Sequence, residues 1–219
     1  MKRFFVTGTD TGVGKSQTAG ALLSLLARKG GRPFAFKPYE TGIPRGGVPE
    51  DATHLRRCAG DWQPLATVCL HRFVPPLAPG VAAERSPRPG AWRQTLEQFR
   101  RFEGSGVVEG AGGLLVPLDG THLVVDLAEE LKLPVVLVAR AGLGTLNHVG
   151  LSLEALRARR LKVAAVVLSR SAQASDPSET DNPRWIRKMG VKVLGPVAHL
   201  PDPRRRHAAF ERAVAPLVS

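Results

Sequence analysis

Cysteine is scarce in this chain, and long apolar runs are missing. The 219 residues include two cysteines, Cys58 and Cys69. Their spacing matches no metal-binding motif, and two cysteines are too few to indicate a disulfide framework, so we expect two reduced, half-buried thiols. No run of about 18 apolar residues occurs, which leaves no candidate for a membrane-spanning helix.

The N-terminus lacks the apolar core of a secretory signal peptide. Its first residues, MKRFFVTG, pass from two charges directly into a short strand-like run. We therefore expect a soluble, cytoplasmic protein. With 219 residues, 43% of them hydrophobic, the chain can bury a sizeable core, and its length favours a single domain over residues 1–219.

Clustered positive charge is also missing, although the net charge is +12. Arginines occur all along the chain, and only Arg204 to Arg206 form a triple. This scatter favours arginine on solvated faces, and we expect neither a nucleic-acid nor a membrane partner. An enzyme that uses ATP would also gain from positive potential around its anionic substrate.

Short apolar runs alternate with longer amphipathic stretches. This alternation predicts an α/β protein with three layers, α/β/α, and a mostly parallel central sheet. We place strands at 3–7, 34–37, 106–109, 134–139, 162–168 and 191–194. We place helices at 15–29, 51–59, 91–102, 123–131, 145–159, 183–189 and 203–217. The stretches 39–49 and 74–90, rich in Pro and Gly, are predicted loops, and the polar stretch 169–182 is predicted to be mobile.

The stretch VTGTDTGVGKSQTAG, residues 6–20, has the features of a phosphate-binding loop between a buried strand and a helix. Gly12 and Gly14 allow backbone N–H groups to turn toward phosphate oxygens at the positive end of the helix. Lys15 would neutralise the β- and γ-phosphates, and the Ser16 hydroxyl would bind Mg²⁺. The first glycine stands one position further from the Gly-Lys pair than in the common pattern. The alternative is a glycine-rich turn that binds nothing.

Two acidic residues are placed to complete a magnesium site, which prefers a few carboxylates and water. Glu109 ends the apolar run GVVEG, at the carboxyl edge of a predicted strand, where ligands bind in open α/β sheets. Asp51 opens the predicted helix DATHLRR. For Asp51 alone, a helix N-terminal charge explains the residue equally well.

Two further segments indicate anion binding. Lys37 follows a predicted strand in FAFKPYETG, and Pro38 disfavours a helix there, so its ammonium should project from the sheet edge. A solvated lysine at a strand end remains the alternative. In RAGLGTLNHVG, glycines precede Thr145 and Asn147 at a predicted helix start, where backbone N–H groups could bind a carboxylate or a phosphate. A plain capped helix start is the alternative.

Six segments, taken together and in order, resemble the dethiobiotin synthetase family of biotin biosynthesis. VTGTDTGVGKS is similar to that family's phosphate loop, including its longer spacing, and FKPYETG is similar to its K-P-x-x-[ST]-G motif. The other four matching segments are PEDATHL, FVPPLAPGVAAE, VVEGAGGLLVPL and LGTLNH. The likeness runs from the phosphate loop to the LGPV segment at residues 194–197.

The resemblance implies a P-loop fold and an ATP- and Mg²⁺-dependent ring closure. In that reaction 7,8-diaminononanoate and CO₂ or bicarbonate give dethiobiotin, with release of ADP and phosphate. A carbamate is a poor electrophile, and transfer of the γ-phosphoryl group turns it into a mixed anhydride that the second amine attacks. Because that attack is intramolecular, positioning can supply effective molarities on the order of 10⁵ to 10⁸ M.

The resemblance also implies roles for single residues. Those expected to act on the phosphoryl group or the carbamate are Lys15, Lys37 and Thr11, and those expected to hold Mg²⁺ are Ser16, Asp51 and Glu109. Those expected to bind ATP are Gly12, Val13, Gly14, Lys15, Ser16, Gln17, Glu109, Gly110, Ala111, Gly112, Ser169, Ala198, His199 and Leu200. Those expected to bind the diamine are Lys37, Thr41, Gly144, Thr145, Leu146 and Asn147. The last four belong, in the family, to the neighbouring subunit, which implies a homodimer with shared active sites.

Two positions depart from the family pattern. Ser169, followed by Arg170, stands where some members have an asparagine that reads adenine, and a serine makes fewer fixed hydrogen bonds to a base edge. Other nucleoside triphosphates are therefore expected to compete with ATP. Gly12 stands where some members have an acid, which removes a charge near the phosphates.

Two other classes share such a loop. DNA-partitioning and cell-division ATPases usually carry a lysine in K-G-G-x-G-K where this chain has Asp10, which argues against a switch ATPase. The second alternative is another amide-forming synthetase with a larger substrate. Such chains commonly have a second domain that supplies ammonia, and here neither cysteine has a nucleophile context and no sequence remains for that domain.

Overall fold

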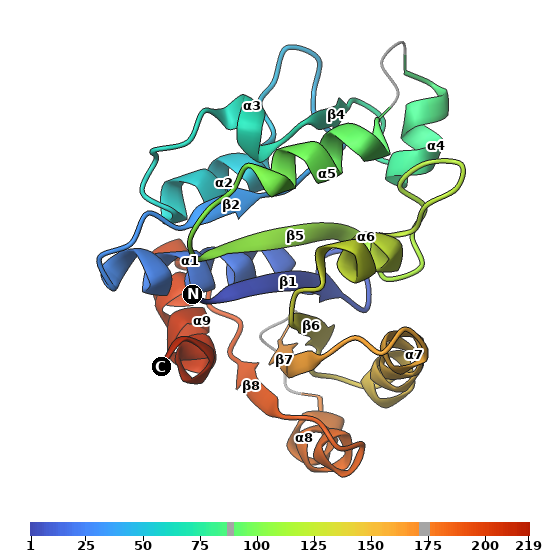
Figure 1. The fold of residues 1–219 in the computed structure, drawn as a ribbon. Helices are drawn as coiled ribbons and strands as arrows, with labels where there is room; N and C mark the ends of the chain where they lie inside the picture. Colours follow the sequence, from blue (N-terminus) through green and yellow to red (C-terminus); the bar gives the residue numbers. More distant parts are fainter. Residues whose placement is uncertain (87–89, 171–175) are drawn as a thin grey trace.

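A six-stranded parallel sheet forms the centre of the computed structural model, which describes residues 1–86, 90–170 and 176–219 (Figure 1). Its strands are β1 (Arg3–Gly8), β2 (Phe34–Phe36), β5 (Gly106–Gly113), β6 (Val135–Arg140), β7 (Val163–Ser169) and β8 (Val193–Val197). They lie in the order β2-β5-β1-β6-β7-β8, and every pairing is parallel. The predicted α/β fold with a parallel sheet is confirmed. The single domain expected over residues 1–219 stays a prediction.

Helices cover both faces of the sheet, because alternate strand residues point to opposite sides. Phe4 and Val6 pack into a core shared with helices α1 (Lys15–Arg28), α2 (Glu50–Cys58) and α9 (Pro203–Val218). Phe5, between them, packs into the core on the opposite face of the sheet. The helices on that side are α5 (Trp92–Arg100), α6 (Val124–Leu131), α7 (Thr145–Ala158) and α8 (Ser178–Lys188). The strands are buried on both faces, as their continuous apolar runs predict.

Four short elements lie where loops were predicted or where nothing was assigned. Strands β3 (Tyr39–Thr41) and β4 (His71–Phe73) pair in parallel as a second sheet. Helices α3 (Leu65–Val68) and α4 (Pro79–Glu84) flank β4 in the chain. The prediction of loops throughout 39–49 and 74–90 was therefore wrong in part, since elements this short produce no periodic pattern. Residues 87–89 of the second loop lie outside the described residues.

The prediction of a mobile stretch at 169–182 is also corrected. Ser169 ends β7, and α8 begins at Ser178, five residues before the predicted start at Pro183. The carboxylate of Asp176 accepts hydrogen bonds from the Ser178 backbone N–H and hydroxyl, which orders the helix start. Asn182 donates to the backbone oxygen of Ala141 at 2.7 Å. Residues 171–175 of this stretch lie outside the described residues.

The remaining element bounds differ from prediction by a few residues. Strand β5 extends to Gly113, four residues beyond the expected end, because its glycines continue beside β1 as far as the Gly8–Gly113 pair. Among the described residues, no helix is both long and apolar enough to cross a membrane.

Candidate nucleotide-binding site

The phosphate loop connects β1 to α1 at the carboxyl edge of the sheet (Figure 1). Gly12 and Gly14 have φ angles of 68° and 100°, a region that a residue with a Cβ adopts at a cost. Gly14 also directly precedes α1, whose first N–H groups have no intrahelical partner. The loop therefore has the open backbone donors and the positive helix end that a phosphate group requires.

Lys15 extends back along the loop, and its ammonium donates to the backbone oxygen of Asp10 at 2.8 Å. Burial lowers the pKa of Lys15, while the nearby carboxylate of Glu109 opposes this shift. The side chain is held as a bridge across the loop, so its charge faces the space in front of α1.

Three charged side chains meet beside the loop. The buried Lys37 ammonium lies 2.6 Å from Glu109 Oε1 and 3.3 Å from Asp51 Oδ2. Glu109 Oε1 also accepts a hydrogen bond from the Ser16 hydroxyl at 2.9 Å. Lys37 is only 4% exposed, which rules out the alternative of a solvated lysine at a strand end.

The pKa shifts follow from this burial and pairing. Burial alone would lower the pKa of Lys37, but the carboxylates of Glu109 and Asp51 outweigh it and raise that pKa, so the ammonium stays charged. Burial raises the pKa of Glu109, and Lys37 opposes that shift. For Asp51 burial would also raise the pKa, but Lys37 and the Ser16 hydroxyl bring it below its usual value.

The oxygens around Ser16 fit a magnesium ion. Ser16 contributes a hydroxyl, and Asp51 and Glu109 contribute carboxylates, which are the hard donors that Mg²⁺ prefers. Glu109 Oε2 is buried and has no hydrogen-bond partner among the described residues. The three residues predicted as metal ligands therefore come together, and one of their oxygens is free to bind an ion.

An open cavity of about 390 Å³ lies in front of these groups. Of the residues predicted to bind nucleotide, metal or substrate, those that line it are Thr11, Gly12, Gly14, Lys15, Ser16, Gln17, Lys37, Thr41, Asp51, Ala111 and Gly112. Glu109 is fully buried directly behind it. Val13 and Gly110 are buried and do not line it; a Cβ on Gly110 would lie 2.9 Å from Val124, so this glycine allows close packing.

Two residues of the cavity were not assigned a role from the sequence. The Glu40 carboxylate accepts hydrogen bonds from the backbone N–H groups of Asp51 and Ala52, at 3.0 and 2.9 Å, and so caps α2. Tyr39 also lines the cavity, and its hydroxyl accepts from Thr95 at 3.2 Å. Both residues lie within the FKPYETG motif, and this position in the motif is the feature of the sequence that could have indicated their roles.

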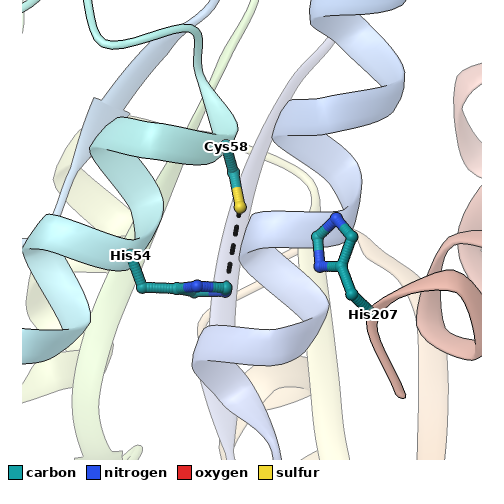
Figure 2. A group of neighbouring side chains, drawn as sticks. All are labelled: His54, Cys58 and His207. Atoms are coloured by element: carbon teal, nitrogen blue, oxygen red, sulfur yellow. Dashed lines mark hydrogen bonds between the residues drawn. The ribbon is translucent and has the colours of Figure 1, made fainter. Parts of the chain in front are cut away.

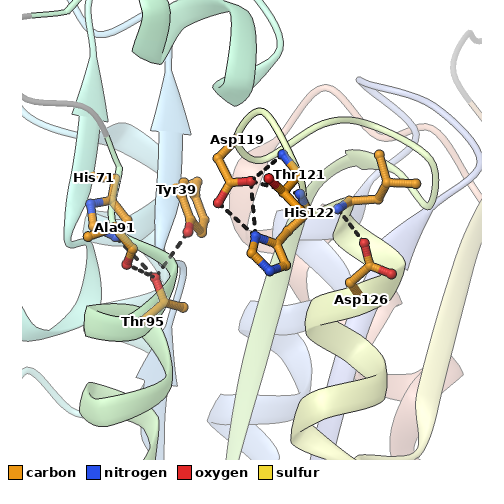
Figure 3. A network of polar contacts seen from close by, with 9 residues as sticks. Tyr39, His71, Ala91, Thr95, Asp119, Thr121, His122 and Asp126 are labelled. Carbon is orange, nitrogen blue, oxygen red and sulfur yellow. Dashed lines mark hydrogen bonds and ion pairs between the residues drawn. The ribbon is translucent and has the colours of Figure 1, made fainter.

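Thr95 also lies 3.0 Å from His71 Nε2, so His71 and Tyr39 share one partner (Figure 3). His71 is on β4 and Tyr39 on β3, so this contact helps to hold the small sheet against α5. Burial lowers the pKa of His71 to about 4, which keeps its imidazole neutral at pH 7. The neutral His71 ring and Thr95 therefore help to hold Tyr39 in place on the wall of the cavity.

The segments predicted to read the base lie to the other side of the phosphate loop. Ser169 Oγ lies 3.2 Å from the position that a Cβ on Gly14 would take, so the end of β7 adjoins the loop. Ala198, His199 and Leu200 follow β8 and are not among the residues that line the cavity. Their predicted contact with the nucleotide stays a prediction.

The segment Gly144 to Asn147 forms the start of α7 and does not line the cavity of its own chain. Gly144 has a φ of 87° at the helix start. Thr145 is buried, and its hydroxyl has no hydrogen-bond partner among the described residues. The structure therefore separates this predicted substrate-binding group from the phosphate loop within one chain.

A parallel sheet with a glycine-rich Gly-Lys-Ser loop between its central strand and a helix defines a P-loop nucleotide-binding protein. Residues 2–206 match the model of an AAA domain family. Curated proteins named ATP-dependent dethiobiotin synthetase BioD are similar over most of the chain. Together these matches show that the chain belongs to the ATP-dependent dethiobiotin synthetase family.

The similarity to these relatives is nearly full-length. The protein of Anaeromyxobacter sp. (strain K) is 43% identical over 205 residues, which cover 92% of this chain and 90% of that one. The protein of Anaeromyxobacter dehalogenans (strain 2CP-C) is 42% identical, and the match covers 98% of each chain. The protein of Haloferax mediterranei is 42% identical over 85% of this chain and 79% of its own. A solved signal recognition particle receptor FtsY from Elizabethkingia anophelis has a TM-score of 0.46 and 15% identity, over 96% of this chain and 65% of that one.

Proposed function

We propose that this chain is an ATP-dependent ligase of biotin biosynthesis that forms dethiobiotin from 7,8-diaminononanoate and CO₂. Family membership carries the assignment. The structural observation that supports it is the buried Lys37, held by Glu109 and Asp51 on the wall of a cavity that the phosphate loop also lines. Asp10 stands where DNA-partitioning and cell-division ATPases usually carry the additional lysine of their loop, which further favours a ligase over a switch ATPase.

The reaction needs three steps at this site. One amine of the diamine adds to CO₂ and loses a proton, which gives a carbamate. A carbamate oxygen then attacks the γ-phosphorus of ATP, the bond to ADP breaks, and a carbamic-phosphoric anhydride forms. The second amine attacks the carbonyl carbon of this anhydride and loses a proton, the bond to phosphate breaks, and the ring closes.

The chain's own residues act on charge and position. Lys15 and Lys37 stabilise negative charge on the transferred phosphoryl group, and Lys37 also holds the carbamate oxygen. Thr11 and Thr41 donate hydrogen bonds to the phosphate and the diamine region. Ser16, Asp51 and Glu109 would hold Mg²⁺, which when bound neutralises charge on the phosphate oxygens.

We also propose a homodimer in which α7 of one subunit completes the site of the other. Leu143, directly before α7, is 87% exposed, and Leu115 and Leu151 are exposed along a groove of about 390 Å³ between α7 and the phosphate loop. A second subunit on this groove would cover them and bring the unpaired Thr145 hydroxyl toward a substrate carboxylate. We expect the enzyme to act in the cytoplasm, with ATP, the diamine and CO₂ as its small-molecule partners.

The shared site has a direct test. Lys37→Ala and Asn147→Ala should each be inactive alone, and mixing them should restore part of the turnover, because a mixed dimer contains one intact site. A mixture as inactive as its components would contradict the shared site and leave the reaction itself untouched.

The reaction is tested by phosphate release from ATP with and without 7,8-diaminononanoate and bicarbonate. We expect release that depends on both, with one dethiobiotin formed per phosphate. Release that ignores both would favour the switch-ATPase alternative. The same assay with GTP and CTP measures how far Ser169 relaxes base selectivity.

A further inference from the structure

Helices α1, α2 and α9 enclose a second group of ligand-type side chains, further along the same face of α2 than Asp51. His54 and Cys58 come from α2, and His207 comes from α9; they converge over α1 (Figure 2). Cys58 Sγ lies 3.8 Å from His54 Nε2, and one ligand atom from each of the three residues lies within 4.8 Å of the others. None of the three lines the nucleotide cavity.

Space for these atoms is made by a glycine inside α1. A Cβ on Gly20 would lie 2.5 Å from His54 Nε2 and 3.0 Å from Cys58 Sγ. Glycine in a helix interior costs about 0.5 to 1 kcal/mol relative to alanine. Helix α1 therefore has a glycine, which disfavours the helical conformation, at the point where the His54 imidazole and the Cys58 thiol approach it.

His207 is oriented by neighbours that leave one ring nitrogen open. Its Nε2 lies 3.0 Å from Ser24 Oγ and 3.2 Å from Glu211 Oε1. Its Nδ1 is buried and has no hydrogen-bond partner among the described residues. When Nε2 carries the proton toward Glu211, Nδ1 presents a lone pair, which is how a carboxylate commonly orients a metal-binding histidine.

The surrounding charges select against a hard cation. Arg28 of α1 pairs with Glu211 of α9 at 2.8 Å, and Arg57 of α2 and Arg204 of α9 line the same open groove of about 550 Å³. No free carboxylate is left among the groove-lining residues, so Mg²⁺ or Ca²⁺ would find positive charge and few oxygens. A thiolate and two imidazoles, in contrast, form strong bonds with zinc-like ions.

We propose that His54, Cys58 and His207 bind a Zn²⁺ ion, with water as the fourth ligand. Zinc–sulfur and zinc–nitrogen bonds of about 2.3 and 2.1 Å place tetrahedral ligand atoms roughly 3.3 to 3.8 Å apart. The Cys58–His54 separation already meets this range, and the widest pair closes by about 1 Å through rotation of half-buried side chains. Both cysteines are free thiols in the structure, as expected, and the proposal gives the thiol of Cys58 a further role as a ligand.

The site would tie α9 to α2 across α1, in addition to the polar contacts that already join α1 and α9. Asp51 lies in the first turn of α2, and the His54 ring lies near the backbone of Ser16 at the start of α1. An ion at this point would stabilise the folded chain and hold the catalytic ends of α1 and α2 in place.

The test uses the full-length protein freed of metal with a chelator and kept reduced, with Mg²⁺ in excess to occupy the catalytic carboxylates. One equivalent of Co²⁺ should give a thiolate-to-cobalt charge-transfer band and the intense visible bands of tetrahedral cobalt, and one equivalent of Zn²⁺ should displace it. Zn²⁺ at about 100 times its Kd should also raise Tm by several degrees.

Matched variants separate the site from adventitious binding. Cys58→Ser should abolish the charge-transfer band and weaken Zn²⁺ binding at least tenfold, whereas Cys69→Ser, the other cysteine, should change neither. His207→Gln should weaken binding as Cys58→Ser does, and it decides the matter if Cys58→Ser fails to fold. Absence of the band in the parent protein, its persistence in Cys58→Ser, or unchanged affinity in folded His207→Gln would overturn the proposal.

Discussion

Helix α2 presents two kinds of chemistry along one face, because Asp51, His54 and Cys58 follow one another at spacings of three and four residues. At the start of the helix, Asp51 joins the buried Lys37 and Glu109 in a set of oxygen donors and one ammonium, in which nearly every charge is paired. Toward α9, His54 and Cys58 join His207 in a half-buried set of nitrogen and sulfur donors. The first set is pre-assembled without a ligand. The second is only approximately assembled, and we infer that an ion would complete it.

The difference shows why one set could be predicted and the other could not. Asp51, Lys37 and Glu109 each stand at the end of a recognisable strand or helix, and parallel strands bring their carboxyl ends to one edge. His54 and Cys58 are one helical turn apart, which is an ordinary spacing, and His207 lies near the other end of the chain. Only the packing of α9 on α1 brings it to them.

The largest expected effect is on catalysis at the oxygen-donor set. Lys37→Ala should lower kcat for dethiobiotin formation by roughly 10³-fold, because the transition-state charge loses its buried ammonium. Nucleotide binding should persist, since the phosphate loop is unchanged. Steady-state kinetics and nucleotide titration measure the two, with the exposed Lys162→Ala as control. Unchanged turnover would remove Lys37 from the mechanism.

Stability should also depend strongly on this set. Glu109→Gln should lower the free energy of unfolding by about 3 kcal/mol, because a buried ammonium loses its closest partner. Urea denaturation without nucleotide or Mg²⁺ measures this loss. Glu130→Gln, at an exposed position on α6, should have little effect. If the free energy of unfolding falls no more than in the Glu130→Gln control, Asp51 alone is sufficient to compensate the charge of Lys37.

His71, which belongs to neither set, should make stability depend on pH. The pKa of His71 falls from an ordinary 6.5 to about 4 on folding, so the unfolded chain binds a proton first as pH drops. The stabilisation is present above pH 6.5 and should be lost between pH 6.5 and 4, by about 3 kcal/mol. Unfolding free energies across this window should fall less steeply in His71→Gln. If the unfolding free energy of His71→Gln falls with pH as steeply as that of the parent protein, other groups, including those on α2, cause the loss of stability in acid.

The smallest effect on turnover should come from a change that separates the two sets of side chains along α2. Gly20→Ala places a methyl group against His54 and Cys58 without touching the oxygen donors. We expect Zn²⁺ affinity to fall at least tenfold, kcat to change less than twofold, and metal-free stability to shift by about 1 kcal/mol or less, because better helix propensity offsets the close contact. Equal losses of zinc affinity and turnover would show that the two sets of side chains are not independent.

Sequence reasoning located the sheet, the phosphate loop and the oxygen donors, but it missed the roles of Tyr39 and Glu40. Glu40, on β3, accepts hydrogen bonds from backbone N–H groups at the start of α2. Because this capping residue lies about ten residues before the helix, no capping motif at the helix start reveals it. The helix predicted at 183–189 begins at Pro183, whereas Pro183 lies inside α8 in the structure. Contacts made across the fold, such as the hydrogen bond that Asn182 donates to the backbone oxygen of Ala141, help to decide such ends.

The phosphate loop, near the start of the chain, rests against the last helix. A Cβ on Gly14 would lie 3.2 Å from the Phe210 ring, and α9 packs along α1. During synthesis on the ribosome the loop therefore emerges long before the surface that supports it. A nascent chain that lacks α9 lacks the surface that supports the loop, so we expect nucleotide binding to follow the synthesis of α9.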